Sequence, residues 1–249
     1  MIAAGGWAND TGALAMDYAQ TSVVMLKAED AFDFFTFCQR NPRPCPILEV
    51  LEPGQRRTRY MADGADICNE LGRYRVFRDG ELVDEPESVE AYWSDDVVTF
   101  LLGCSYSFES ALVQAGIRLR HLTEDTIPSV YNTSIDLEPA GRFKGKLVVS
   151  MRPIRRDQVT RAVQVTSRFP LTHGAPVHIG DPSPLGIEDI ERPDACDPPR
   201  MQPDEVPVFW ACSLTPSEVA LASGVPLLIN HYPARMFISD RRVQELATL

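Results

Sequence analysis

Side chains that can exchange protons near neutral pH gather in the stretch THGAPVHIGDPSPLGI, residues 172–187, which contains His173, His178 and Asp181. A further histidine, His231, follows the apolar run PLLIN. Imidazole titrates close to pH 7, so these histidines are candidate catalytic acids or bases. Structural roles are the alternatives, because His178 can pack within a strand and Asp181 before a proline suits a turn.

The same stretch could in principle bind a metal, because zinc accepts imidazole and carboxylate ligands. A glycine and a proline lie between His173 and His178, so the two rings do not share a helix face as in an HExxH motif. We therefore predict no metal site. The chain also lacks GxGxxG, P-loop and GxSxG motifs, and we predict no cofactor.

Two turns between a strand and a helix offer sites for a small anion. Cys104 and Ser105 precede one predicted helix, and Cys212, Ser213 and Thr215 precede another. The first N–H groups of a helix lack partners within the helix and carry positive partial charge, which suits a carboxylate. Helix capping alone would also explain the hydroxyl residues, and Cys212 could be a small buried apolar residue.

Two arginines are candidate clamps for the same carboxylate. Arg152 lies in SMRP and Arg168 in SRFP. A guanidinium group can hold a carboxylate through two parallel hydrogen bonds. Ion pairs on the surface are the alternative role for both arginines.

Composition and charge restrict the partners of the chain. Its 249 residues are 44% hydrophobic and carry a net charge of −11, which argues against nucleic acid and anionic membranes as partners. No apolar run is long enough to span a bilayer, and the first 20 residues do not resemble a signal peptide. Six scattered cysteines suggest a reducing compartment, so we expect a cytoplasmic protein, with a homo-oligomer compatible with the sequence.

Helical and strand patterns alternate along the chain, which favours an α/β fold with a mixed sheet. We expect one domain from residues 1–110 and 171–249, with residues 111–170 as a smaller α+β unit inserted into it, and we find no internal repeat. The predicted helices cover residues 28–40, 97–102, 105–116, 157–169 and 215–224. The predicted strands cover residues 47–50, 146–154, 175–180, 206–212 and 226–230, with a hairpin over 74–85.

Several long blocks of the chain resemble the D-glutamate cyclase family, whose bacterial members are often described as hydro-lyases. The blocks are FCQRNPRPCPILEV, RYRVFRDGEL, DDVVTFLLGCSYSFESAL, PAGRFKGKLVVSMRPI, TSRFPLTHGAPVHIGDP and EVPVFWACSLTP, within residues 18–240. The chain departs from the family at NHYPARM, where members tend to carry a THAPGHM-like motif. His231 is kept there, and Ala234 and Arg235 replace a Gly-His pair.

The resemblance implies a three-layer α/β domain with a smaller two-layer α+β unit. It also implies a role in amino acid metabolism, the cyclisation of D-glutamate to 5-oxo-D-proline with loss of water. That reaction needs a base, an acid and donors for an oxyanion. We favour His178 and His231 as the acid and base, with His173 and Asp181 as alternatives or orienting partners.

Two other functions remain open at this point. One is a hydratase or dehydratase that acts on another small carboxylic acid. The other is a binding protein for a small acid that has lost turnover, which the replacement of the Gly-His pair keeps open.

Overall fold

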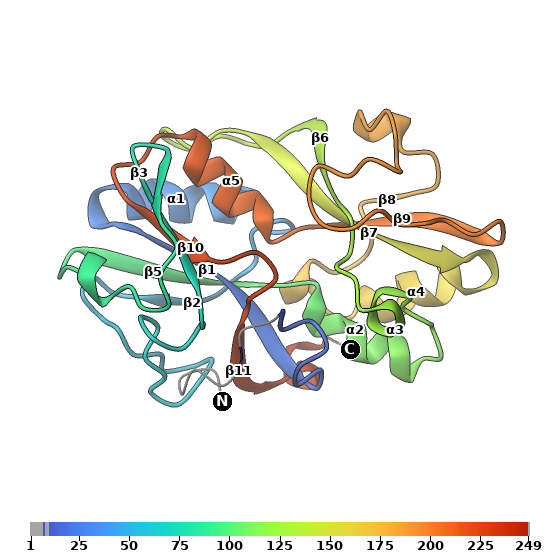
Figure 1. Ribbon diagram of the computed structural model, residues 1–249, viewed down its shortest axis with the longest axis horizontal. Helices are drawn as coiled ribbons and strands as arrows, with labels where there is room; N and C mark the ends of the chain where they lie inside the picture. Colours follow the sequence, from blue (N-terminus) through green and yellow to red (C-terminus); the bar gives the residue numbers. More distant parts are fainter. Residues whose placement is uncertain (1–6, 8–9, 249) are drawn as a thin grey trace.

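Two antiparallel β-sheets lie side by side and form the body of the protein (Figure 1). The structure is a computed structural model that describes residue 7 and residues 10–248. Part of the N-terminal stretch in which we expect no signal peptide therefore lies outside the described residues. The helices are α1 (Ala28–Arg40), α2 (Tyr106–Gln114), α3 (His121–Glu124), α4 (Val159–Thr166) and α5 (Leu214–Ala222).

The first sheet is built around the long buried strand β1. Its strands, in spatial order, are β2 (Ile47–Leu51), β5 (Val97–Gly103), β1 (Tyr18–Lys27), β10 (Leu228–His231), β3 (Tyr74–Arg78) and β4 (Glu81–Asp84), and β11 (Phe237–Arg242) also pairs with β1. The second sheet has the order β6 (Val130–Asp136), β7 (Lys146–Arg155), β9 (Glu205–Ala211) and β8 (His178–Ile179). Strand β7 is the long buried strand of this sheet.

Each sheet is covered by two helices. One of them follows a strand of the same sheet, and the other follows a strand of the opposite sheet. Helices α1 and α5 bury Phe34 and Val219 in one apolar cluster against the first sheet. Helices α2 and α4 bury Phe108 and Ala162 in another cluster, with Trp210 of the second sheet. Figure 1 shows α5 beside α1 and α2 beside α4. Since α2 follows β5 and α5 follows β9, the chain crosses between the sheets at the start of both helices.

The α/β composition predicted from the sequence is confirmed, but the predicted mixed sheet is wrong. Every strand pairing among the described residues is antiparallel. Parallel neighbours need a helix that packs back onto the same sheet. Here α2 and α5 pack on the opposite sheet from the strand that precedes them. The chain therefore makes no parallel crossover connection after β5 or β9.

Most predicted elements are confirmed, and the helix predicted over residues 97–102 is wrong. That segment is strand β5, which is buried along its whole length between β2 and β1. A strand buried on both faces shows no alternation, and its pattern cannot be told from that of a buried helix. The strand predicted over 175–180 is reduced to β8.

The division into residues 1–110 with 171–249, and 111–170, stays a prediction. The second sheet takes β6 and β7 from the smaller range and β8 and β9 from the larger one. If the units follow the sheets, the smaller unit would extend beyond residue 170.

Strand β5 ends at Gly103, where the segment carrying Thr172 passes over it. A side-chain carbon at Gly103 would lie 1.8 Å from the carbonyl oxygen of Leu171 and 3.2 Å from the Cα of Thr172. Only glycine therefore permits this approach, which holds the loop before His173 against the end of β5.

We predict that Gly103→Ala lowers the free energy of unfolding by about 3 kcal/mol, because backbone atoms must move to accept the methyl group. Urea denaturation measures the change. Gly145→Ala is the control, because the nearest neighbour of its methyl group would be the Val219 side chain, at 2.8 Å, with backbone no closer than 3.9 Å. A loss at Gly103 no larger than that at Gly145 would contradict the role of this contact.

Candidate active site

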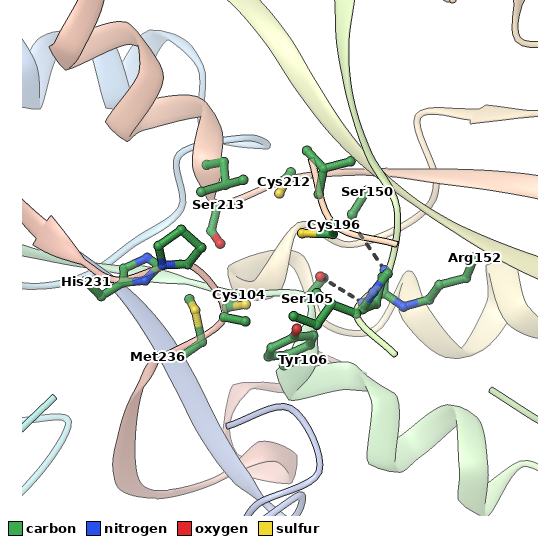
Figure 2. Close-up of a pocket in the computed structure, with 16 residues that line it drawn as sticks. Cys104, Ser105, Tyr106, Ser150, Arg152, Cys196, Cys212, Ser213, His231 and Met236 are labelled. Atoms are coloured by element: carbon green, nitrogen blue, oxygen red, sulfur yellow. Dashed lines mark hydrogen bonds between the residues drawn. The ribbon is translucent and has the colours of Figure 1, made fainter. Parts of the chain in front are cut away.

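A pocket lies where the chain crosses between the two sheets (Figure 2). It is lined from both crossings, from β7 and β10, and from the turn after β10. Its lining includes Cys104, Ser105, Ser150, Arg152, Cys212, Ser213 and His231. In Figure 2, His231 and Arg152 lie on opposite sides of the pocket, with Cys104 and Ser213 between them. Besides Arg152 and His231, four of the predicted site residues line the pocket, and they form two Cys-Ser pairs that the fold brings together.

Arg152 is fixed in the wall of the pocket by Glu109 and two serines. Its side chain is 1% exposed, and its Nε and Nη2 donate to Oε1 of Glu109 at 2.7 and 2.5 Å. Nη1 donates to Ser150 Oγ at 3.2 Å, and Nη2 donates to Ser105 Oγ at 3.0 Å. A buried guanidinium group in this setting places a fixed positive charge at the pocket, as carboxylate binding requires.

Glu109 is the counter-charge of this site, and no pattern in the sequence around it predicts this role. It lies in the first turn of α2 and is fully buried. Burial alone would raise the pKa of Glu109, but His121 and Arg152 outweigh it and hold that pKa below its usual value. The Nε2 of His121 lies 3.1 Å from Oε2 of Glu109. Glu109 is therefore ionised at neutral pH and orients the guanidinium group.

His231, at the end of β10, faces the pocket as a neutral imidazole. Its Nδ1 lies 2.9 Å from the carbonyl oxygen of Tyr232, which can only accept, so Nδ1 carries the proton. Nε2 is then the acceptor and lies 3.0 Å from Ser22 Oγ. Burial lowers the pKa of His231 to about 4. At neutral pH the ring is therefore neutral, and its Nε2 accepts a hydrogen bond and has no proton to give.

The two Cys-Ser pairs place the N-termini of α2 and α5 at the pocket. Ser105 and Ser213 are the N-cap residues, and neither side chain caps its own helix. The hydroxyl of Ser105 is used by Arg152 instead. Burial raises the pKa of the Cys104 thiol and raises that of Cys212 to about 12, so both thiols are protonated at neutral pH. Hydroxyl and thiol groups therefore line a pocket into which two helix N-termini open.

The remaining predicted residues are not among those that line this pocket. His178 lies in β8 at the edge of the second sheet, with its Nε2 against the Asp181 carbonyl. The Asp181 side chain accepts from the backbone and hydroxyl of Ser183. Arg168 is exposed after α4, while Thr215 is buried and bonds Val148 in β7.

His173 is buried close by, in the loop that crosses Gly103. Its Nδ1 lies 2.8 Å from the carbonyl oxygen of Arg43, so this nitrogen carries the proton. Its Nε2 is buried with no hydrogen-bond partner among the described residues. Burial lowers the pKa of His173 to about 4. The ring joins its loop to the segment at Arg43, and it does not line the pocket.

Ala234 and Arg235, where the resemblance implies a Gly-His pair in the family, differ in their relation to the pocket. Ala234 lines it and has a φ of 60°, a left-handed conformation that favours glycine. Arg235 is absent from the lining and places its guanidinium carbon 5.2 Å from the centre of the Tyr232 ring. The methyl group of Ala234 therefore lies at the pocket, and the guanidinium group of Arg235 lies against Tyr232.

The described part of the chain contains no group of three or more His, Cys, Asp or Glu side chains that could hold a metal ion. Among its helices, none has the length and apolar character needed to cross a membrane.

Comparison with known proteins connects this pocket to a family. The model of the family described as D-glutamate cyclase matches residues 98–240, which include both Cys-Ser pairs, Arg152 and His231. A solved nitrogen repressor-like protein from Methanococcus jannaschii aligns with a TM-score of 0.42 and 9% identity, over 90% of this chain and 88% of that one. That similarity is too low to indicate a common function.

Curated relatives match over almost the whole chain. A protein of Stutzerimonas stutzeri named "Putative hydro-lyase" is 48% identical over 100% of this chain and 94% of its own length. Proteins with the same description from Geobacillus kaustophilus and Rubrobacter xylanophilus are each 49% identical, over 100% and 98% of this chain and 95% and 94% of their own lengths. Because nearly half of all positions are identical over this length, the chain belongs to the D-glutamate cyclase family of hydro-lyases.

Proposed function

We propose that this protein cyclises D-glutamate to 5-oxo-D-proline and water in the pocket between the two sheets. One observation carries the proposal. A buried guanidinium group, that of Arg152, faces a neutral imidazole, that of His231, across a pocket into which two helix N-termini open. A cation and helix dipoles suit a small dicarboxylate, and a neutral imidazole suits proton removal from an amine.

The reaction forms a bond between the amine nitrogen and the γ-carboxyl carbon and breaks one carbon–oxygen bond. The ammonium group gives up two protons, and the departing oxygen takes up two and leaves as water. Atoms and charge therefore balance without a cofactor. Holding both ends of the substrate chain in one pocket supplies much of the rate, because the attack is then intramolecular.

His231 is the base in this proposal. Its Nε2 accepts at present from Ser22, and the same lone pair would accept a proton from the substrate amine. Proton donation back to the leaving oxygen follows once Nε2 is protonated, so one ring serves both steps. The backbone N–H groups at the start of α5 suit the oxyanion that forms during attack.

A covalent route through Cys104 or Cys212 has little support. Burial raises the pKa of both thiols, and the thiolate is the nucleophilic form. The carboxyl group is also already beside the amine within one substrate, so an acyl intermediate gains little.

Incubation of the purified protein with D-glutamate tests the proposal directly. Chiral chromatography should show 5-oxo-D-proline from D-glutamate and not the L product from L-glutamate. Turnover of a 2-hydroxy dicarboxylate alone would favour a dehydratase instead. Thermal stabilisation by these acids without turnover of any would indicate a binding protein.

We predict that His231→Gln lowers kcat by about 10² to 10⁴, the usual contribution of a positioned acid or base. His178→Gln is the matched control, since His178 is not in the pocket lining. It should leave kcat within about threefold of the parent protein, as expected for a residue away from the chemistry. A loss with His178→Gln and none with His231→Gln would assign the base to the stretch at 172–187.

A second prediction concerns stability against pH. His173 and His231 have folded-state pKa values of about 4, below the unfolded value of 6.5. The unfolded chain therefore binds more protons as the pH falls from 6.5 towards 4, and stability is lost over that window. Between pH 7 and pH 5 each histidine should cost about 2 kcal/mol.

Urea denaturation at pH 7, 6 and 5 measures this loss, and His173→Asn should remove about half of it. A free energy of unfolding that stays constant from pH 7 to pH 5 would mean that the two rings are not buried as neutral groups.

A third prediction concerns the replaced Gly-His pair. Ala234→Gly should stabilise the fold by about 1 kcal/mol, because glycine adopts the left-handed conformation without a steric penalty. Arg235→His should change kcat/KM by less than about threefold, because Arg235 contacts Tyr232 outside the pocket. A larger gain of turnover in Arg235→His would show that the family's second histidine has a catalytic role.

A further inference from the structure

The two strand-to-helix crossings have matching sequences. Residues 103–116 read GCSYSFESALVQAG, and residues 211–224 read ACSLTPSEVALASG. Both segments have Cys-Ser before the helix, a hydroxyl residue two positions after that serine, and glycine at the end. The correspondence is a constant offset of 108 positions, without insertion or deletion.

The hydroxyl residues make the same contacts in both places. Ser107 Oγ accepts from the backbone N–H of Gln20 at 2.9 Å and lies 3.1 Å from the carbonyl oxygen of the same residue. Thr215 Oγ1 accepts from the N–H of Val148 and donates to its carbonyl oxygen, each at 3.2 Å. Gln20 in β1 therefore corresponds to Val148 in β7.

The strand registers agree with this correspondence. Thr21 pairs with Gly103 in the first sheet, and Val149 pairs with Ala211 in the second. The neighbouring strands follow the same order, β2-β5-β1-β10 in one sheet and β8-β9-β7-β6 in the other. In each half the last helix and strand cross to the other sheet. Ser22 and Ser150 take equivalent places.

We infer that the chain is an internal duplication whose halves exchange their last helix and strand, and that the pocket therefore consists of two half-sites, one for each end of a dicarboxylate. The cationic half-site consists of Ser105, Ser150 and Arg152. The neutral half-site consists of Ser213, Ser22 and His231. This inference rests on the proposed function for the identity of the substrate and adds its orientation.

The half-sites differ because three residues have no equivalent in the other half. Arg152 corresponds to Val24, and its partner Glu109 corresponds to Ser217. His231 lies at the end of β10, and β6, which takes the corresponding place beside β7, contains no histidine. The duplication therefore supplies two similar helix N-termini, and these three residues give one of them a charge and the other a base.

Arg152 has capacity for a ligand in the cationic half-site. A guanidinium group has five N–H donors, and four hydrogen bonds to Glu109, Ser105 and Ser150 are present. Nη1 makes one of these bonds, so its second N–H has no partner among the described residues. This donor belongs to a side chain that is 99% buried and lines the pocket, and a carboxylate oxygen would satisfy it.

The chemistry then sets the orientation of the substrate. A carboxylate bound to Arg152 is stabilised in its ionised form, which resists attack by an amine. The α-carboxylate, which survives the reaction, therefore belongs in the cationic half-site. The γ-carboxyl group, which loses an oxygen, belongs beside His231, because Arg152 is the one Lys or Arg side chain among the residues that line the pocket.

Binding of three ligands by calorimetry tests the orientation: D-glutamate, its α-amide and its γ-amide. The parent protein should bind the α-amide at least about tenfold more weakly than the γ-amide, because only the α-amide lacks the carboxylate for Arg152. Equal affinities, or a weaker γ-amide, would overturn the assignment.

Ser150→Ala and Ser22→Ala are matched variants, since each removes one buried hydroxyl from an equivalent position. Ser150→Ala should raise the Kd for D-glutamate and the γ-amide about tenfold and leave the α-amide within about threefold. Ser22→Ala should leave all three Kd values within about threefold and lower kcat about tenfold or more. Arg152→Lys should act in the same direction as Ser150→Ala, and circular dichroism checks that each variant is folded.

These results separate the inference from the proposed function. Preference for the γ-amide without any 5-oxo-D-proline formation would leave the half-sites standing and overturn the reaction. Turnover of D-glutamate with the opposite amide preference would leave the reaction standing and overturn the half-sites. Failure of all three ligands to bind would overturn both.

Discussion

The rest of the structure depends on the two places at which the chain passes from one sheet to the other. At Cys104 and at Cys212 a buried strand ends and a helix begins over the opposite sheet. Each crossing is held by a hydroxyl, Ser107 or Thr215, that bonds the backbone of the neighbouring long strand. Because both crossings meet, two helix N-termini open into one pocket, and residues more than 100 positions apart become neighbours.

A buried ion pair fixes the guanidinium group in the wall of this pocket. The side chains of Arg152 and Glu109 are 1% and 0% exposed. Removing one partner of a buried pair typically costs about 3–5 kcal/mol of stability, because the other charge is left unpaired. Ser105 and Ser150 accept further hydrogen bonds from Arg152, and His121 lies 3.1 Å from the second oxygen of Glu109. The pair therefore holds a guanidinium group in place, as the proposed binding of a substrate carboxylate requires.

Many elements of the fold could be predicted from local sequence patterns. Helix α1 and the hairpin of β3 and β4 were predicted because amphipathic spacing and an Asp-Gly turn are local signals. The helix predicted at β5 and the mixed sheet were wrong because burial on both faces and crossing to another sheet are tertiary properties. The repeat was overlooked because its two copies share only a few identical residues, and their equivalence shows in hydrogen bonds and register.

The candidate site was predictable to a similar degree. The Cys-Ser turns, Arg152 and His231 were identified because hydroxyls before helices, guanidinium groups and imidazoles have recognisable chemistry. Glu109, Ser22 and Ser150 were missed, since nothing in their local sequence reveals that they face Arg152 or His231. The histidines of the stretch at 172–187 were predicted to be catalytic, but His173 and His178 are not among the residues that line the pocket. Residue types in the sequence indicated the possible chemistry, but the sequence did not show which side chains point into the same pocket.

The central claim is that the pocket at the two crossings binds the substrate beside His231. The chain has four histidines, so nuclear magnetic resonance can follow each imidazole while D-glutamate is added. The account predicts that the His231 ring signals shift with saturation and that those of His178 stay unchanged. Saturating shifts at His178 with a constant His231 would contradict the account and place the substrate at the edge of the second sheet.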